Sequence, residues 1–373
     1  MTRDSQPELL EAPRQAAHRR LINLLGPMIG LILVVFVGGV AEQRMEGSLN
    51  YWSPQNQCLI LTQTITVAMG AIGMTLIIIS GGIDLSAGSI IALTAVGSAW
   101  IVRELSPADV AATLGGFEAV WVPAVALAGG VALGCLAGAM NGFLVTRLKL
   151  APFIITLGMM TFARGAAKGI ADMQRIDAPL NWISEFTAGN LVLFRMNFRR
   201  VYDLPLLGKV HIAWIGPVAV STAVVVTVAL AIVAAVLLGR MRLGRHIFAI
   251  GSNEATARLC GVRVDWTKWL VYAMAGMMFG LAGVSDFGRL SVGDPTTAMG
   301  KELDIIASVV IGGGSLSGGV GSVFGSLIGA LLMAHLRNLC IHLELPNYVQ
   351  EMVVGAVIVV AVTVDRLRQR RRD

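Results

Sequence analysis

The stretch Arg240-Met-Arg-Leu-Gly-Arg-His-Ile-Phe-Ala-Ile-Gly-Ser-Asn-Glu-Ala-Thr-Ala-Arg-Leu-Cys-Gly261 is a charged island between two long apolar runs. Of the 373 residues, 55% are hydrophobic and 14% are charged, whereas about a quarter are charged in an average soluble domain. A helix needs about 20 mostly apolar residues to cross a bilayer. The sequence therefore predicts an all-α, polytopic membrane protein, because runs without Asp, Glu, Lys or Arg cover 21–41, 57–83, 85–102, 119–146, 210–239, 269–285 and 305–336.

Basic residues set the predicted topology. Leu150–Ala171 and Pro346–Val364 are two weaker spans, and 305–336 counts as one pass or, divided at its glycines, as two. Lysine and arginine concentrate on the cytoplasmic side. Both chain ends are basic, so both are expected in the cytoplasm, and this requires an even number of crossings. We therefore predict about ten transmembrane helices in a single domain over 21–365, with cytoplasmic tails 1–20 and 366–373, an outer insert 172–209 and an inner loop 240–268.

The inner loop carries the signals of a short surface helix. Ser252 or Asn253 can cap a helix N-terminus with a side-chain oxygen. Glu254 and Arg258 are four residues apart, the spacing of a stabilising pair, and Gly261 suits the residue after a helix end. Such a capped helix, held between two spans, can transmit force from a soluble partner. From spacing alone, an ordinary cytoplasmic connecting loop is the default interpretation.

Two glycine-rich segments interrupt the apolar runs. The first, Ser80-Gly-Gly-Ile-Asp-Leu-Ser-Ala-Gly88, has Gly82 at the break, with Asp84 and Ser86 beside it. An ionisable residue at such a place is a functional hypothesis, and a plain helix cap is the alternative for Asp84. The second, Val309-Val-Ile-Gly-Gly-Gly-Ser-Leu-Ser-Gly-Gly-Val-Gly-Ser322, joins two half-length apolar pieces and repeats a Leu-Ser-Gly-like pattern of the first. Broken helices and internal repeats are typical of transporters.

Polar residues at the ends of the fourth and fifth spans are further candidates. Asn141 and Thr156 either bond to a neighbouring helix or face a water-filled path, and Pro152 suits the first turn of a helix. The sequence has no Gly-x-x-x-x-Gly-Lys-Ser/Thr, His-Glu-x-x-His or Gly-x-Ser-x-Gly. A phosphate-cradling loop, a zinc protease and a serine hydrolase are therefore excluded or disfavoured, and we expect no catalytic residue, metal or bound cofactor. A channel is disfavoured because no selectivity-filter repeat is visible.

Five stretches taken together resemble a known family: 80–88, Met140-Asn-Gly-Phe, Ala151-Pro-Phe-Ile-Ile-Thr-Leu-Gly-Met, 244–261 and Gly300-Lys-Glu-Leu-Asp-Ile-Ile-Ala-Ser-Val-Val-Ile-Gly-Gly-Gly-Ser-Leu-Ser-Gly-Gly. In this order they are similar to the permease subunit of bacterial ABC importers for monosaccharides of the ribose, xylose and galactofuranose type. The resemblance covers about residues 25–365. Ser252, Ala255–Thr256 and the 172–209 insert depart from the pattern, and the insert leaves the binding protein and the sugar open.

The resemblance implies a non-catalytic subunit of the bacterial inner membrane. Its expected partners are a second permease copy or a paralogue, two ATPase subunits or one fused tandem ATPase that binds the ATP, and a periplasmic sugar-binding protein. It makes 240–268 the loop that couples to the ATPase, through Gly244, Arg245, Gly251, Asn253, Glu254, Arg258 and Gly261. The expected residues of the path and the helix breaks are Gly82, Asp84, Ser86, Asn141, Pro152, Phe153, Thr156, Glu302, Asp304, Gly313, Ser315 and Ser317.

Two other classes of function stay open on the residues alone. A cation-coupled secondary sugar transporter would use Asp84, Glu302 or Asp304 as its coupling sites. A membrane-embedded enzyme would need a nucleophile and a base at one depth, and the sequence does not show such a pair. A neighbouring gene for an ATPase with a phosphate-binding loop would favour the importer.

Overall fold

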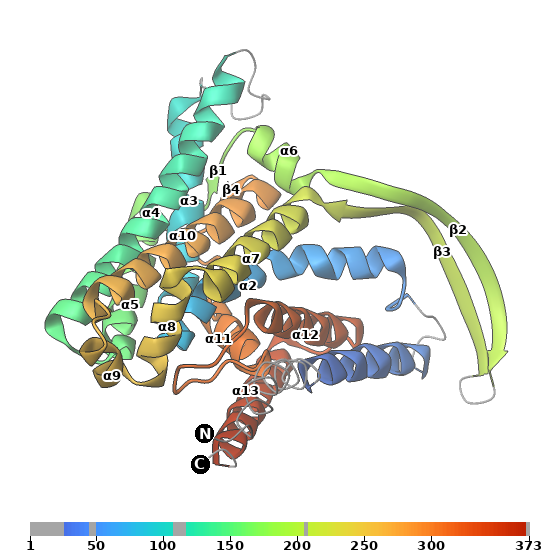
Figure 1. Cartoon of the computed structure of the whole chain (residues 1–373). Coiled ribbons are helices and arrows are strands. Elements are labelled where there is room, and N and C mark those ends of the chain that lie inside the picture. The colour runs from blue at the N-terminus through green and yellow to red at the C-terminus, as the bar shows by residue number, and fades with distance from the viewer. Residues whose placement is uncertain (1–25, 45–49, 107–116, 205–207, 371–373) are drawn as a thin grey trace, which may run out of the picture.

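The computed structural model describes residues 26–44, 50–106, 117–204 and 208–370, so the predicted tail 1–20 lies outside the described residues. It is a helical bundle with one long hairpin that arches away from it (Figure 1). The helices are Gly26–Arg44, α2 Pro54–Ile79, α3 Ala87–Leu105, α4 Glu118–Leu148, α5 Pro152–Ile170, α6 Trp182–Ala188, α7 Thr222–Arg240, α8 Arg242–Ser252, α9 Glu254–Leu259, α10 Val264–Leu290, α11 Lys301–Ile311, α12 Val323–His342 and α13 Asn347–Arg370. The strands are β1 Ile176–Asp177, β2 Asn190–Leu204, β3 Gly208–Ser221 and β4 Val292–Gly293.

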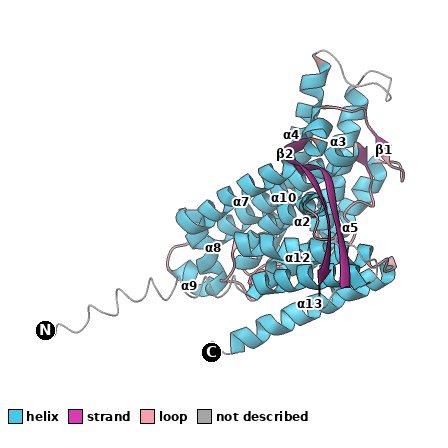
Figure 2. Ribbon diagram, turned by 90° about the vertical axis from the view of Figure 1, so that its right-hand side faces the viewer, coloured by secondary structure: helices cyan, strands magenta, loops and turns pink. Residues whose placement is uncertain are grey.

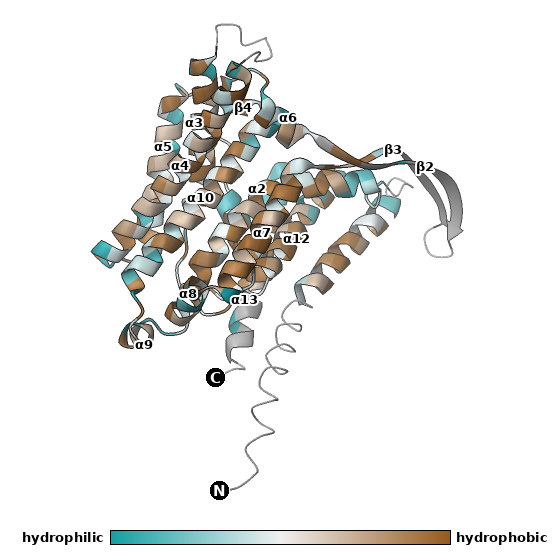
Figure 3. Ribbon diagram, turned by 45° about the horizontal axis from the view of Figure 1, so that its top comes forward, coloured by the Kyte–Doolittle hydropathy of each residue, from teal (hydrophilic) through white to brown (hydrophobic). Residues whose placement is uncertain are grey.

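A helix lies at each of the ten predicted crossings, and the helical, polytopic class is confirmed. Among the described residues, seven helices are long and apolar enough to cross a membrane: Gly26–Arg44, α2, α3, α4, α7, α10 and α12. Hydrophobic residues dominate these helices along their length (Figure 3). The predicted domain limit at 365 falls within α13, which continues as one helix to Arg370.

The division of 305–336 into two half-length pieces is only half right. The first piece, α11, has 11 residues, or about 16 Å at 1.5 Å per residue, too short to cross alone. The second piece, α12, has 20 residues and is long enough to span. The glycines at 312–321 therefore end a half-helix and lead into a full one.

The bundle is organised around α2, whose most apolar window is 89% buried, against 28% for α4 and 22% for α7. Helix α10 packs against α2, α3 and α4. Its contact with α4 is backbone to backbone: a β-carbon at Gly134 or Gly138 would overlap carbonyl oxygens of α10 at Gly276 or Tyr272. Small residues spaced four apart thus allow the two helices to approach closely.

The insert predicted at 172–209 contains one short helix, α6, and its second half belongs to a hairpin. Strands β2 and β3 pair antiparallel, with Asn190 opposite Ser221 at one end and Leu204 opposite Gly208 at the other. The hairpin lies beside the bundle rather than inside it (Figure 2). The predicted span 210–239 was therefore wrong in its first part, because α7 begins only at Thr222. A short apolar run does not by itself distinguish a strand from a helix, and residues 212–221 are such a run.

Candidate functional site

The charged loop 240–268, predicted to lie inside, contains two short helices joined at Asn253. Helix α9, Glu254–Leu259, begins at Asn253, whose side-chain oxygen accepts the backbone N–H of Thr256 at 2.9 Å. Gly261 follows the helix with a φ of 84°, in the left-handed region that glycine adopts without strain. The predicted capped helix is confirmed, and of the two candidate caps it is Asn253 that acts.

Helix α8 carries the loop back to the bundle. It buries Gly244, Ile247 and Ile250 on one face and leaves Arg245 exposed. A β-carbon at Gly244 would overlap the carbonyl oxygens of Leu237 and Leu238 in the last turn of α7. The start of α8 is therefore held tightly against the membrane-spanning helix before it.

Ion pairs attach α9 to the beginning of α10. Glu254 accepts from Lys268 Nζ at 2.6 Å, and Arg258 lies 3.0 Å from Asp265 and 3.5 Å from Glu254. The hydrogen bond from Lys268 holds the pKa of Glu254 below its ordinary value. The predicted Glu254–Arg258 pair is thus present, but within a four-residue network. Because α9 is otherwise exposed, with only Ala257 buried, this network sets its orientation on α10.

The end of α8 lies in contact with both glycine breaks. A β-carbon at Gly251 would overlap the carbonyl oxygen of Ile79, at the end of α2, and the nitrogen of Gly319, in the second break. Gly319 N–H also donates to the Ile79 carbonyl at 2.9 Å, and a β-carbon at Gly318 would lie 3.0 Å from Gly81 Cα. We call the meeting of Ile79, Gly81, Gly251, Gly318 and Gly319 the glycine junction. It joins the loop 240–268 to both breaks through close backbone contacts.

Side chains hold the first break. The Asp84 carboxylate accepts the backbone N–H of Ser86 at 2.8 Å and its hydroxyl at 2.5 Å, and Asn141 Nδ2 lies 3.3 Å from the other Asp84 oxygen. Thr156 Oγ1 accepts the N–H of Leu85 at 3.1 Å. Asp84, Ser86, Asn141 and Thr156 are all 0% exposed. The carboxylate therefore holds the turn before α3 rather than capping that helix, whose N-cap residue is Ser86 and has no side-chain capping bond, and Asn141 and Thr156 bond to this break.

The other predicted path residues do not join this cluster. Pro152 opens α5, as expected, and Phe153 is 49% exposed. Gly82 lies against the Tyr272 ring hydroxyl, which has no hydrogen-bond partner among the described residues. In the second break Gly313 has a φ of 90° and the Ser315 and Ser317 hydroxyls lie 2.8 Å apart.

Glu302 and Asp304 belong to two different places at the start of α11. Glu302 lies against Gly88 in the first turn of α3, where a β-carbon would overlap its Oε2. Asp304, 1% exposed, accepts from Arg337 Nε at 2.9 Å and lies 3.4 Å from Lys301 Nζ. Sequence reasoning missed Arg337 and Lys301. The three-residue spacing of Lys301 and Asp304 is typical of an ion pair on one helix and could have indicated this contact. Arg337 is 33 residues after Asp304, and nothing in the sequence indicates that the two side chains meet.

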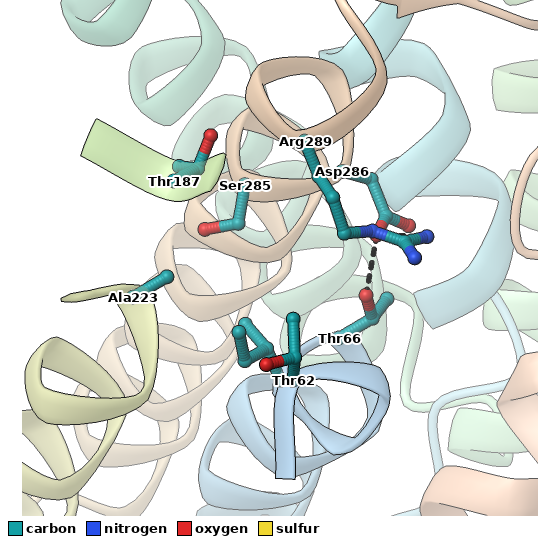
Figure 4. A pocket seen from close by; sticks show the side chains of 8 residues that line it. Thr62, Thr66, Thr187, Ala223, Ser285, Asp286 and Arg289 are labelled. Atoms are coloured by element: carbon teal, nitrogen blue, oxygen red, sulfur yellow. Dashed lines mark hydrogen bonds and ion pairs between the residues drawn. The ribbon is translucent and has the colours of Figure 1, made fainter. Parts of the chain in front are cut away.

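A pocket of about 380 Å³, lined by both charged and apolar side chains, opens between α2, α10, α11 and α12. A small recess of about 10 Å³ lies beside it and shares Thr66, Asp286 and Arg289 with it (Figure 4). Thr66 donates to Asp286 at 2.5 Å, and Arg289 lies 3.8 Å from the same carboxylate. Among the described residues, no group of three or more His, Cys, Asp or Glu is placed to hold a metal ion.

A family model described as "Branched-chain amino acid transport system / permease component" matches residues 57–362, which include the glycine junction and the pocket. The chain belongs to this family of ABC-importer permease components. As such it is a non-catalytic, multi-pass membrane subunit that works with ABC partner subunits, and ATP is bound by the partner ATPase. Family membership decides against a cation-coupled transporter and a membrane-embedded enzyme.

Curated relatives support the same assignment. The chain is 38% identical over 325 residues to the ribose import permease protein RbsC of Escherichia coli K12, with 86% of this chain and 89% of that one covered. It is 34% identical over 360 residues to RbsC of Bacillus subtilis, covering 96% and 98%. It is 31% identical over 388 residues to the xylose transport system permease protein XylH of Haemophilus influenzae, covering 92% and 96%. No solved structure matches the chain significantly.

Proposed function

We propose that this permease provides the alternating-access path for a monosaccharide delivered by a periplasmic binding protein. Relatives named for ribose and xylose import, similar over most of their length, support this substrate class. The proposal includes a second permease copy or a paralogue, two ATPase subunits or one tandem ATPase, and both chain termini in the cytoplasm. It places 240–268 inside, as the coupling loop, and 172–209 outside, where it is available to the binding protein.

The glycine junction is the observation that carries the coupling part of this proposal. Helix α9 exposes Leu259 by 88%, and Trp266 beside it on α10 is 57% exposed. These apolar side chains, together with Arg258 and Arg245, suit a groove on an ATPase subunit. A displacement of α9 passes through Asn253 to Gly251, and from there directly to the backbone of both breaks. Nucleotide can shift the path between its states only if it favours one of them, and the junction supplies that physical connection.

The test uses the whole importer, with its ATPase and binding protein, in lipid vesicles. Gly251→Ala inserts a methyl group at the junction, whereas Gly239→Ala on α7 is a matched control, because no described atom lies within 4 Å of its added β-carbon. We expect Gly251→Ala to reduce ATP-driven uptake of ribose or xylose at least about tenfold, the equivalent of about 1.4 kcal/mol, while ATP hydrolysis continues. Normal uptake by Gly251→Ala would refute the coupling assignment. Failure of the wild-type importer to take up any monosaccharide would refute the substrate class.

A further inference from the structure

The pocket of about 380 Å³ is lined by five charged residues that the proposed coupling does not use: Asp286, Arg289, Lys301, Asp304 and Arg337. It lies near the end of α10, whereas the ion pairs of the coupling loop lie at its beginning. From Asp265 to Asp286 the distance along α10 is about 30 Å at 1.5 Å per residue. The pocket is therefore at the end of the bundle remote from α9. Its volume falls in the usual range of about 300–1,000 Å³ for small-molecule sites.

Both carboxylates of the pocket are already bonded to protein groups. Arg337 donates to Asp304 from Nε at 2.9 Å and from a terminal nitrogen at 3.0 Å, in a two-point contact, and Lys301 approaches the same carboxylate at 3.4 Å. Asp286 accepts the hydroxyl hydrogen of Thr66 at 2.5 Å. Since three basic groups stand beside them, the two acids do not offer a site for a cation.

The basic side chains keep hydrogen-bonding capacity that faces the pocket. The side chains of Arg289, Lys301 and Arg337 are 40%, 31% and 30% exposed. A lysine has three donors and an arginine five, and the contacts within the protein use only some of them. The second oxygen of Asp286 and the amide of Gln63, also in the lining, add acceptors. Donors and acceptors therefore both line this space, and its three basic and two acidic side chains nearly balance in charge.

We propose that this pocket is a transient binding site for a neutral polyhydroxylated molecule, a monosaccharide, on its way through the permease. Each hydroxyl group of a sugar both donates and accepts, so it can satisfy a basic and an acidic neighbour at once. A carboxylate or phosphate would instead face Asp286 and Asp304. The proposal rests on the proposed function, since it assigns to that path a place where its substrate is held.

Helix α11 connects this pocket to the glycine junction. Its first turn provides Lys301 and Asp304, and it ends at Gly312, which packs against Gly325 of α12 so closely that a β-carbon would overlap the Gly325 carbonyl. Along its length Ile305 contacts Gly70 of α2, and Ser308 contacts Gly329 of α12. A short helix confined in this way moves as a rigid body. Displacement of the second break therefore changes the pocket, and the sugar is held differently in the two states of the path.

A bulky side chain in the pocket tests the proposal in the complete importer. Ala334 on α12 lines the pocket, and Ala334→Trp fills part of it. Val233→Trp is the control, because Val233 on α7 is 62% exposed on the outside of the bundle. For Ala334→Trp we expect sugar uptake to fall at least about tenfold, the equivalent of about 1.4 kcal/mol, with ATP hydrolysis stimulated by the binding protein within about twofold of wild type. Uptake at the wild-type level would overturn the proposal.

A second pair of variants separates hydrogen bonding from charge and does not depend on filling space. Arg289→Gln keeps an amide donor, whereas Arg289→Leu keeps none. We expect uptake of ribose or xylose to be lower in Arg289→Leu than in Arg289→Gln, with ATP hydrolysis similar in both. Equal loss in the two variants would show recognition of charge and would overturn the assignment to a neutral sugar. If the wild-type importer shows no ATP-driven monosaccharide uptake, the proposed function is refuted. If the wild-type importer takes up sugar and the pocket variants take it up equally well, only the assignment of the pocket is refuted.

Discussion

The two glycine-rich breaks carry similar sequences and meet at the same point, but they are held in different ways. The first, 80–86, is fixed by side chains: Asp84, Ser86, Asn141 and Thr156 bond to one another or to its backbone and are fully buried. The second, 312–322, is shaped by backbone bonds such as Ser315 N–H to Val320 carbonyl at 3.0 Å, and is partly exposed. Gly313, Gly318 and Gly319 have positive φ there, whereas in the first break only Gly81 does.

This difference indicates a division of roles within the path. A buried cluster of hydrogen-bonded polar side chains is costly to open, because each separated donor or acceptor loses its partner out of reach of water. A glycine segment held by a few backbone bonds rearranges more easily. We therefore infer that the first break is the fixed side of the glycine junction and the second is the side that moves when α9 is displaced.

The largest expected effect comes from a β-carbon in the second break. Gly319→Ala places an alanine in the left-handed backbone region, which costs about 1–2 kcal/mol. The new β-carbon also lies too close to Ser252, and such overpacking costs a further amount of about 1–3 kcal/mol. Gly81→Ala is the matched control in the first break: its φ is 82°, but no described atom lies within 4 Å of the new carbon. ATP-driven uptake per inserted importer should be lost in Gly319→Ala and mostly retained in Gly81→Ala. Equal uptake in the two variants would remove the distinction between the breaks.

A smaller effect is expected from the carboxylate of the first break. Asp84→Ala leaves the Ser86 N–H and the Ser86 hydroxyl without their acceptor, at about 1–3 kcal/mol for a buried unpaired group. Asp84→Asn keeps an oxygen that can accept from Ser86. Thermal unfolding of the purified importer should therefore show Asp84→Ala clearly less stable and Asp84→Asn close to wild type, with uptake per folded importer retained in Asp84→Asn. A stable Asp84→Asn importer that does not transport would assign Asp84 to the path rather than to the turn before α3.

The smallest effect is expected in the exposed ion pairs of α9. Glu254 is 46% exposed in its side chain, and exposed pairs contribute about 0–1 kcal/mol. Glu254→Gln should therefore leave the unfolding temperature nearly unchanged but reduce uptake relative to ATP hydrolysis, because it loosens α9 from α10. Since the pKa of Glu254 is lowered by Lys268, its contribution persists at neutral pH and is lost only as acidification passes below the ordinary carboxyl range. A large loss of stability on substitution would contradict this account.

Features of the fold that depend only on residues adjacent in the chain could be predicted from the sequence. The cap at Asn253 and the glycine at 261 followed from the geometry of a helix end, and the helical positions followed from runs of apolar residues. The start of α7 could not be predicted in this way. Residues 212–221 form an apolar run that is compatible with a helix or a strand, and in the structure they belong to strand β3. The full length of α12 did not follow from the sequence either, since glycines permit a break without fixing how long the next helix is.

Contacts between distant segments could not be derived from the sequence. Nothing near Gly251 indicates that Ile79 and Gly319 lie against it, because the contact depends on how three segments pack. The bond between Asp304 and Arg337 joins two helices across a turn of unpredictable shape. Asp84 shows the same limit: its residue type suggested a polar role at a break, but only the positions of Ser86 and Asn141 show that its oxygens are already bonded.

Hydrogen–deuterium exchange of the whole importer in lipid, with and without trapped ATP, tests most directly whether the coupling loop moves the second break. Gly319 N–H, bonded to the Ile79 carbonyl, and the neighbouring amides of 312–322 report on one break, and the amides of 80–86 report on the other. The account predicts that trapped ATP changes exchange in 312–322 and leaves 80–86 unchanged. Exchange that changes in 80–86 alone, or in neither segment, would contradict it.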